Sequence, residues 1–171
     1  MRPFKKYFLR RQFQKKLIEN EVHRTVSQKE IKTVGIITTD EISKWVNVKE
    51  EVEKILNLKN VKIYSFRPQK KNSNTSFKYF SEKDFNWQGN IYKADFKSFI
   101  DEPFDLLIGS FNKNNLFLES SVLQSNALFK VGISDVNQEL YDIEIAETPI
   151  KTERFFLELK KYLTILRKLK N

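Results

Sequence analysis

The stretch TVGIITTD, residues 33–40, decides the fold. It is short, rich in β-branched residues and almost continuously apolar, which is typical of a strand buried on both faces of a parallel sheet. Residues 42–58 carry apolar side chains spaced three and four apart, which predicts an amphipathic helix, and VKIYSF at residues 61–66 predicts a second strand. A strand, a helix and a strand in this order form a right-handed βαβ unit.

The same alternation of helices and strands continues to the end of the chain. It predicts further elements over residues 94–101, 104–109, 114–126, 129–134, 140–145 and 152–169. Repeated βαβ order indicates an α/β fold, a three-layer, Rossmann-like and mostly parallel sheet of about five strands. We expect one such domain over residues 31–171, preceded by a basic helical arm over residues 1–30.

An irregular insertion at about residues 67–93 interrupts this alternation, and we expect an extended arm or a hairpin there. It places Lys70 and Lys71 near the aromatic groups FKYF, residues 77–80, and FNW, residues 85–87. Such a mixture suits a clamp on single-stranded nucleic acid, because bases stack on aromatic rings. It also suits aromatic side chains that cover the sheet edge or the core, which is the interpretation that we favour.

The composition excludes several classes of site. The 171 residues include no Cys and a single His, His23, which excludes disulfides, zinc–thiolate sites, iron–sulfur clusters and thiol nucleophiles. No apolar run approaches the length of a membrane-spanning helix, and the N-terminus lacks the apolar core of a signal peptide. We therefore expect a cytoplasmic protein without a metal or cofactor, and we assign no catalytic residue.

The net charge of +9 is concentrated at the two ends of the chain. Residues 1–18 hold seven Lys and Arg and no acid, and residues 151–171 hold seven more against two Glu. Clustered cations of this kind favour a polyanionic partner, since they neutralise phosphates and release counterions. The predicted polyanion-binding residues are Arg2, Lys5, Lys6, Arg10, Arg11, Lys15 and Lys16.

A compositional explanation of the charge stands beside this one. Lys outnumbers Arg by 24 to 7 and Asn reaches 14, a bias typical of an AT-rich genome in which Lys is the common solvated residue. On that interpretation the arm only packs on the domain or keeps the protein soluble.

Residues 4–24 are rich in good helix formers, but their apolar residues spread over more than half of the helix circumference. This distribution suggests docking on two surfaces, the protein's own domain and a partner. Because no single apolar face is evident, we expect that deletion of residues 1–24 leaves a cooperatively folding domain.

The segments FDLLIG, residues 104–109, and FKVGISD, residues 129–135, carry two resemblances. With the intervening residues they resemble a family of uncharacterised flavobacterial and other Bacteroidetes proteins annotated only as a domain of unknown function. The same stretch is weakly similar to the N-terminal Rossmann half of heptosyltransferase-type glycosyltransferases. The first resemblance implies no chemistry, and the second implies only a Rossmann-like fold, since 171 residues leave no room for the second domain of those enzymes.

Ligands of open α/β sheets bind at the carboxyl ends of the strands, so the residues after each strand form a candidate ligand crevice. These residues are Thr39, Asp40, Arg67, Asn112, Lys113 and Asp135. Asp40 and Asp135 suit Mg²⁺ or acid/base chemistry, with Arg67 or Lys113 binding an anion. The same residue types also suit helix caps and turns. No glycine-rich phosphate loop follows any strand, and three of the four glycines lie inside strands, where we expect helix packing.

Taken together, these patterns favour a non-catalytic basic module that binds RNA or a ribonucleoprotein surface through its N-terminal helix. One alternative is a small-ligand-binding domain or a small enzyme that uses the crevice. Another is peripheral attachment to an anionic membrane surface through Phe4, Phe8 and the neighbouring cations.

Overall fold

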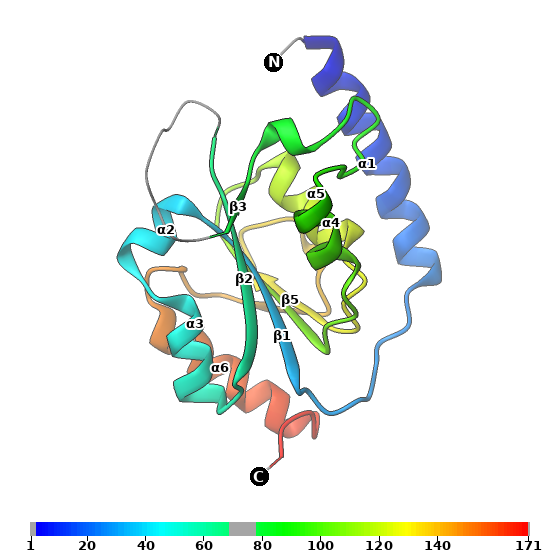
Figure 1. Cartoon of the computed structure of the whole chain (residues 1–171). Helices are drawn as coiled ribbons and strands as arrows, with labels where there is room; N and C mark the ends of the chain where they lie inside the picture. The colour runs from blue at the N-terminus through cyan, green and yellow to red at the C-terminus, as the bar shows by residue number, and fades with distance from the viewer. Residues whose placement is uncertain (1–2, 69–77, 171) are drawn as a thin grey trace.

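A six-stranded, all-parallel sheet forms the centre of the protein in a computed structural model that describes residues 3–68 and 78–170 (Figure 1). The strand order is β3-β2-β1-β4-β5-β6. The strands are β1 (Thr33–Thr39), β2 (Asn60–Phe66), β3 (Tyr79–Phe80), β4 (Leu106–Ser110), β5 (Lys130–Ile133) and β6 (Ile143–Ile145). This arrangement confirms the predicted Rossmann-like α/β fold and adds the two-residue strand β3 to the strands expected from the sequence.

β1 occupies the middle of the sheet, as its apolar sequence predicts. Its residues 34–38 are buried, and Ile36 lies opposite Ile63 of β2 on one side and Ile108 of β4 on the other. The chain first adds β2 and β3 on one side of β1 and then adds β4, β5 and β6 on the other side. The direction in which strands are added therefore reverses between β1 and β4. In open α/β sheets such a reversal opens a crevice at the carboxyl ends of the strands.

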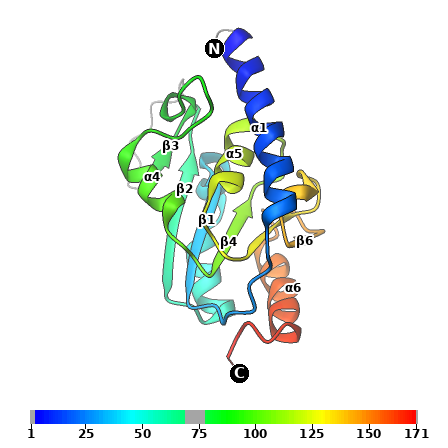
Figure 2. The ribbon, with the colours of Figure 1, turned by 90° about the vertical axis from the view of Figure 1, so that its right-hand side faces the viewer.

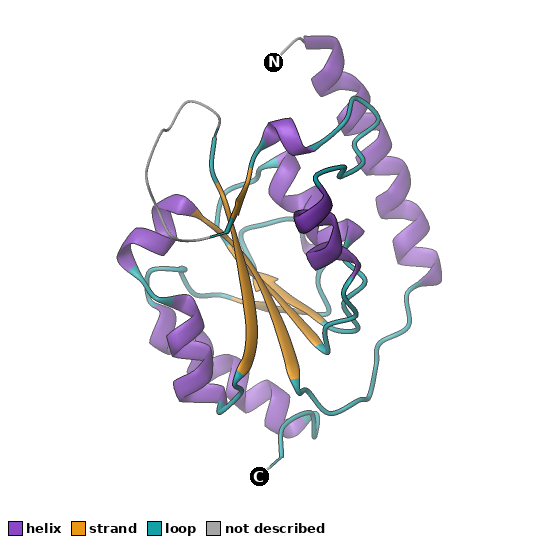
Figure 3. Ribbon diagram, in the orientation of Figure 1, coloured by secondary structure: helices purple, strands orange, loops and turns teal. Residues whose placement is uncertain are grey.

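Helices cover both faces of the sheet (Figures 2 and 3). One layer contains α1 (Pro3–His23), α4 (Ala94–Asp101) and α5 (Leu116–Gln124), with α5 in contact with the other two. The opposite layer contains α2 (Asp40–Trp45), α3 (Val48–Glu51), η1 (Val52–Leu56) and α6 (Thr152–Ile165). In the described part of the chain, no helix combines the length and the apolar character that crossing a membrane requires.

The single helix expected over residues 42–58 is divided into three pieces. Val46 adopts an extended conformation that ends α2, and the side chain of Asn47 then caps α3 by accepting a hydrogen bond from the Glu50 amide (3.2 Å). η1 continues α3 as a π-helical turn and ends at Asn57, whose φ of 54° lies in the left-handed region. β-branched Val46 followed by a capping Asn explains the interruption, because Asn favours helix starts over helix interiors.

Among the described residues of the insertion, β3 runs parallel to β2 and therefore forms no hairpin with it. Residues 69–77, which include Lys70, Lys71 and Phe77, lie outside the described residues. In the remainder, the η2 turn (Glu82–Asp84) precedes a bridge between Phe85 and Ile91. Phe80 and Phe85 are buried, which supports the core-covering interpretation of the insertion, whereas Trp87 is exposed.

α1 has one well-defined buried face. Leu9, Phe13 and Leu17 are each no more than 6% exposed and belong to the same hydrophobic core as the sheet. They recur every four residues, the spacing that brings side chains onto one side of a helix. The expectation that the arm buries no single face is therefore wrong. The expected cooperative folding of the domain without the arm rested on it and loses that basis.

Two strand glycines make room for a tyrosine rather than for a helix. A Cβ atom at Gly132 would lie 2.1 Å from Cζ of Tyr141, and one at Gly109 would lie 2.3 Å from its Oη. Gly109 and Gly132 belong to the adjacent strands β4 and β5, and Tyr141 precedes β6 after the η3 turn (Gln138–Leu140). The Tyr141 ring thus rests directly on the sheet backbone, which corrects the expectation of helix packing at these two positions.

Candidate functional site

The predicted polyanion-binding residues fall into two groups in the structure. Lys5 and Lys16 turn toward the domain, where Lys5 Nζ donates a hydrogen bond to the Phe85 carbonyl (3.2 Å) and Lys16 Nζ donates one to Asn90 Oδ1 (2.7 Å). Partial burial lowers the pKa of Lys16, and Glu19 opposes this effect. These two lysines therefore hold the insertion against α1. Arg2 lies outside the described residues.

The second group is exposed and consists of Lys6, Arg10, Arg11 and Lys15. At 3.6 residues per turn, Arg11 and Lys15 lie on the side of α1 opposite the buried Phe13. None of the ion pairs found among the described residues involves any of the four. Their charges are therefore available to an anionic partner.

Exposed aromatic rings accompany these cations at the N-terminal end of α1. Phe4 is 77% exposed, Tyr7 62% and Trp87 of the insertion 61%. Phe8 contacts both Tyr7 and Trp87 edge to face, with ring centroids 5.8 and 6.2 Å apart. Figure 2 shows that the first turns of α1 extend past the end of the sheet. We call this region the α1 surface; it consists of Phe4, Lys6, Tyr7, Phe8, Arg10, Arg11, Lys15 and Trp87.

The predicted crevice exists as a cavity of about 470 Å³ at the carboxyl ends of the central strands. Thr39, Asp40, Asn112 and Lys113 line it, together with the exposed apolar residues Trp45 and Ile150 and several buried ones. Arg67 and Asp135 are not among its lining residues. Asp135 lies instead in an exposed turn after β5.

Two polar groups of the crevice, those of Asp40 and Thr39, are engaged with the protein itself. Asp40 forms a buried ion pair with Arg67, with Oδ2 2.7 Å from Nε, and the Arg67 guanidinium lies 4.3 Å from the centre of the Tyr79 ring. Thr39 Oγ1 accepts a hydrogen bond from the Ile42 amide (3.2 Å) and so caps α2. These contacts favour a capping role for Thr39 and an ion-pair role for Asp40. Asp40 and Asp135 do not line the same cavity, so the structure does not bring these two carboxylates together. Within residues 3–68 and 78–170, no three His, Asp or Glu side chains are placed to hold a metal ion.

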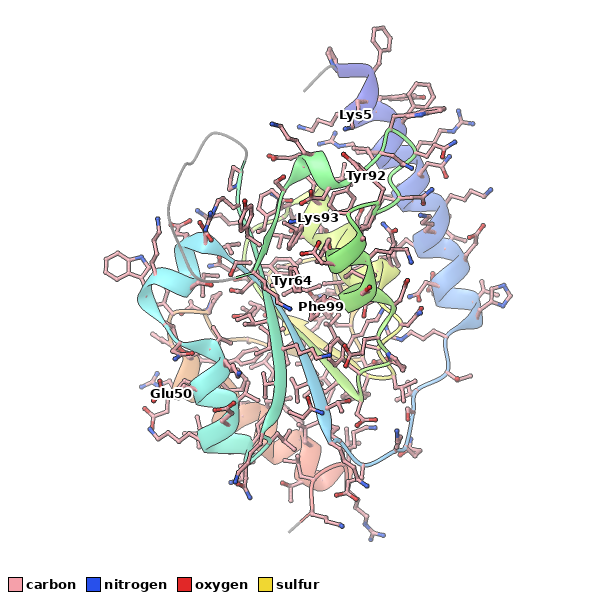
Figure 4. The ribbon with its side chains drawn as sticks, viewed as in Figure 1. Lys5, Glu50, Tyr64, Tyr92, Lys93 and Phe99 are labelled. Carbon is pink, nitrogen blue, oxygen red and sulfur yellow. The ribbon has the colours of Figure 1, made fainter. Side chains whose placement is uncertain are left out.

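A second groove, which the sequence did not suggest, follows the outer edge of β2. It measures about 570 Å³ and lies between α3 and α4, with Tyr64 and Phe99 on its floor (Figure 4). The ring centroids of Tyr64 and Phe99 lie 4.7 Å apart. Burial and, to a smaller extent, the adjacent Asp95 raise the pKa of Tyr64 to about 12. Lys62 and Glu102 form an ion pair of 2.7 Å across the groove wall.

Two buried lysines and one partly buried arginine also escaped the sequence analysis. Lys130 Nζ donates to the carbonyl of Val122 at the end of α5 (2.7 Å), and Lys168 donates to the carbonyl of Ser27. Arg24 pairs with Asp142 just after α1. For Lys130 the sequence did hold a signal, because this lysine lies within the apolar run FKVGI, which predicts a buried strand. Burial is the main reason that the pKa of Lys130 falls to about 7, and Arg24 lowers it further.

Lys130 makes the stability of the protein depend on pH. The unfolded chain keeps this lysine protonated up to about pH 10, whereas the folded chain releases the proton near its pKa of about 7. The unfolded state therefore binds more protons between these values, and stability rises with pH. From about pH 7 to about pH 9, the wild type should gain about 2 kcal/mol more than Lys130→Met.

Urea unfolding at the two pH values measures this difference. Lys160→Met, at an exposed position of α6, is the matched control and should follow the wild type. Parallel pH profiles of the wild type and Lys130→Met would contradict the low pKa.

The fold and the α1 surface define a parallel α/β protein with a basic helix packed on one face of its sheet. The chain belongs to the family of unknown function DUF6913, which it matches over residues 5–166. No curated protein and no solved structure shows significant similarity to it. The expected membership of a family of unknown function is thus confirmed, while the flavobacterial origin and the likeness to heptosyltransferases stay predictions.

Proposed function

We propose that the protein is a binding module for RNA and that the α1 surface makes the phosphate contacts. The observation that carries this proposal is the set of four exposed cations, Lys6, Arg10, Arg11 and Lys15, which have no ion-pair partner among the described residues. A compositional excess of Lys does not explain why two of the four are Arg. Cations on one exposed helix are the electrostatic footprint of a nucleic-acid-binding protein.

The crevice is a weaker basis for function. Its Asp40 is paired with Arg67 and its Thr39 caps a helix, so two of the polar groups that could orient a ligand are already used. Small-ligand sites usually combine an apolar cavity with a few converging polar groups. The α1 surface, by contrast, presents charges that the fold itself does not use.

A membrane surface also fits α1 less well than RNA does. A helix that lies in a bilayer interface needs a continuous apolar face. The continuous apolar face of α1, formed by Leu9, Phe13 and Leu17, is buried in the protein. On the opposite side, Arg11 and Lys15 lie between Tyr7 and Ile18 and interrupt the apolar residues.

The salt dependence of RNA affinity tests the proposal. Changing Lys6, Arg10, Arg11 and Lys15 to Gln preserves helix propensity and removes four phosphate contacts. Each contact contributes about −0.7 to the slope of log K against log salt for single strands, so the slope should become shallower by about 3. Fluorescence anisotropy with an oligouridylate over a salt series measures both slopes.

The matched control removes four exposed lysines elsewhere on the surface, with the substitutions Lys44→Gln, Lys59→Gln, Lys83→Gln and Lys160→Gln. It lowers the net charge equally and should leave most of the wild-type slope. Equal slopes in the two variants would show that net charge alone attracts RNA and would overturn the proposal. Tight binding to anionic vesicles with no RNA binding at low salt would replace it with the membrane alternative.

A further inference from the structure

The aromatic part of the α1 surface has no role in simple phosphate binding. Phe4, Tyr7, Phe8 and Trp87 expose large ring surfaces, although most other Phe residues of the chain are buried in the core. Phe8 contacts both Tyr7 and Trp87 edge to face, so it does not stack flat on either ring. Tyr7 (62% exposed) and Trp87 (61%) therefore leave apolar ring surface open to solvent. Arg10 and Arg11 follow Tyr7 by three and four residues, so they lie beside its ring on the same side of α1.

Trp87 is held in place by a closed loop. The side chain of Asn86 accepts hydrogen bonds from the amides of Gln88 (3.0 Å) and Asn90 (2.9 Å), and the Asn86 amide donates to the Asn90 carbonyl (2.9 Å). Gly89 completes the turn with a φ of 84°, in the left-handed region that favours glycine. These contacts fix the backbone on both sides of Trp87.

The same loop is fastened to the helices beside it. Lys5 and Lys16 of α1 donate to Phe85 and Asn90, at the two ends of the loop, and Gln124 Nε2 of α5 donates to the Gly89 carbonyl (2.8 Å). Figure 4 shows Lys5 near the N-terminal end of α1, above this loop. Trp87 is thus brought to Phe8 by contacts of the fold, and its position does not depend on a ligand. A surface organised before binding loses less entropy when a partner arrives.

Ring faces beside cations match the chemistry of an unpaired nucleotide strand. Bases stack on aromatic side chains with a contribution of about 1–3 kcal/mol each, while Arg and Lys follow the phosphates. A duplex offers the same phosphates but hides the faces of its bases within its own stack. The aromatic cluster therefore distinguishes two forms of RNA that the charges alone do not.

We infer that the α1 surface binds single-stranded RNA in preference to duplex RNA. Bases stack on Tyr7 and Trp87, and Arg10 and Arg11 contact the neighbouring phosphates. This inference rests on the proposed function and deepens it, since it names the form of the nucleic acid. It also joins two parts of the sequence, the N-terminal helix and the insertion, into one site.

The fluorescence of Trp87 provides the direct test. The chain has two Trp residues, and Trp45→Phe at the exposed rim of the crevice leaves Trp87 as the single tryptophan. In this background, an oligouridylate should quench the fluorescence of Trp87, because a base stacked on the indole is an efficient quencher. An RNA duplex of the same length should bind more weakly and leave the fluorescence nearly unchanged.

Affinity measurements separate stacking from charge. Trp87→Ala and Tyr7→Ala should each weaken oligouridylate binding about tenfold, the lower part of the range for one stacked base. The slope of log K against log salt should stay at the wild-type value, since no charge is removed. Trp45→Ala is the matched control and should bind as the wild type does.

The outcomes distinguish this inference from the proposed function. If duplex RNA binds as tightly as the oligouridylate and Trp87→Ala binds as the wild type does, the single-strand inference is overturned while RNA binding through charge stands. If neither RNA binds at low salt, the proposed function fails and the inference fails with it. Quenching of Trp87 together with tenfold weaker binding of Trp87→Ala supports both.

Discussion

Removal of residues 1–24 is expected to abolish cooperative unfolding of the remaining chain. The deletion takes away Leu9, Phe13 and Leu17, and full burial of such side chains contributes about 1.5–3 kcal/mol each. Their sum of about 6 kcal/mol is comparable with the total stability of a typical domain, about 5–15 kcal/mol. The deletion also uncovers α5, whose residues 117–123 are all buried in the intact protein.

Urea unfolding followed by circular dichroism, together with binding of a hydrophobic dye, tests this expectation. The truncated chain should show a broad transition and strong dye binding, as partly folded chains with exposed apolar surface do. Phe13→Ala is the milder variant; it should retain a cooperative transition with a loss of about 3–4 kcal/mol. A truncated chain with a sharp transition of wild-type stability would show that α1 is a separable arm after all.

Gly132→Ala is expected to have the next largest effect, a loss of about 3 kcal/mol in the free energy of unfolding. The new Cβ would lie 2.1 Å from Cζ and 2.2 Å from Cε2 of Tyr141, well inside contact distance, so the whole ring must move. The ring rests on β4 as well as on β5, because Gly109 meets its hydroxyl end. Chemical denaturation of the wild type and the variant measures the loss.

A double-mutant cycle with Tyr141→Ala assigns the loss to this contact. Tyr141→Ala removes the ring that clashes, so Gly132→Ala should cost much less in its presence than in the wild type. Tyr141→Phe should be nearly neutral, since the buried hydroxyl has no hydrogen-bond partner among the described residues. A change in the free energy of unfolding of less than about 0.5 kcal/mol for Gly132→Ala would contradict the close packing of the Tyr141 ring against β5.

The sheet could be predicted from the sequence because burial on both faces leaves a simple pattern. The run TVGIITT has no charge and no alternation, and the structure buries its residues 34–38. Strand β3 left no such pattern, since only Tyr79 and Phe80 pair with β2. The division of the helix at Val46 and Asn47 was also missed. The helical spacing of apolar residues continues through these positions, although α2 ends at Val46 and Asn47 caps the start of α3.

The candidate site was predictable in its charges but not in its geometry. The cluster of cations in residues 1–18 is evident from the sequence, yet which of them face solvent depends on the packing of α1 against α5. The repeat of Leu9, Phe13 and Leu17 every four residues was a usable signal for that packing. The contact of Phe8 with Trp87 joins residues 79 positions apart, and only the folded chain brings them together.

The braced loop around Trp87 makes the lysines of α1 unequal as targets for modification. Acetylation of Lys6 or Lys15 would remove one positive charge and leave the backbone as it is. The same group on Lys5 or Lys16 would remove the charge and add bulk at a hydrogen bond that fastens the Trp87 loop to the helix. Neighbouring lysines in one basic stretch thus differ in effect: two of them set the surface potential, and the other two also hold an aromatic side chain in place.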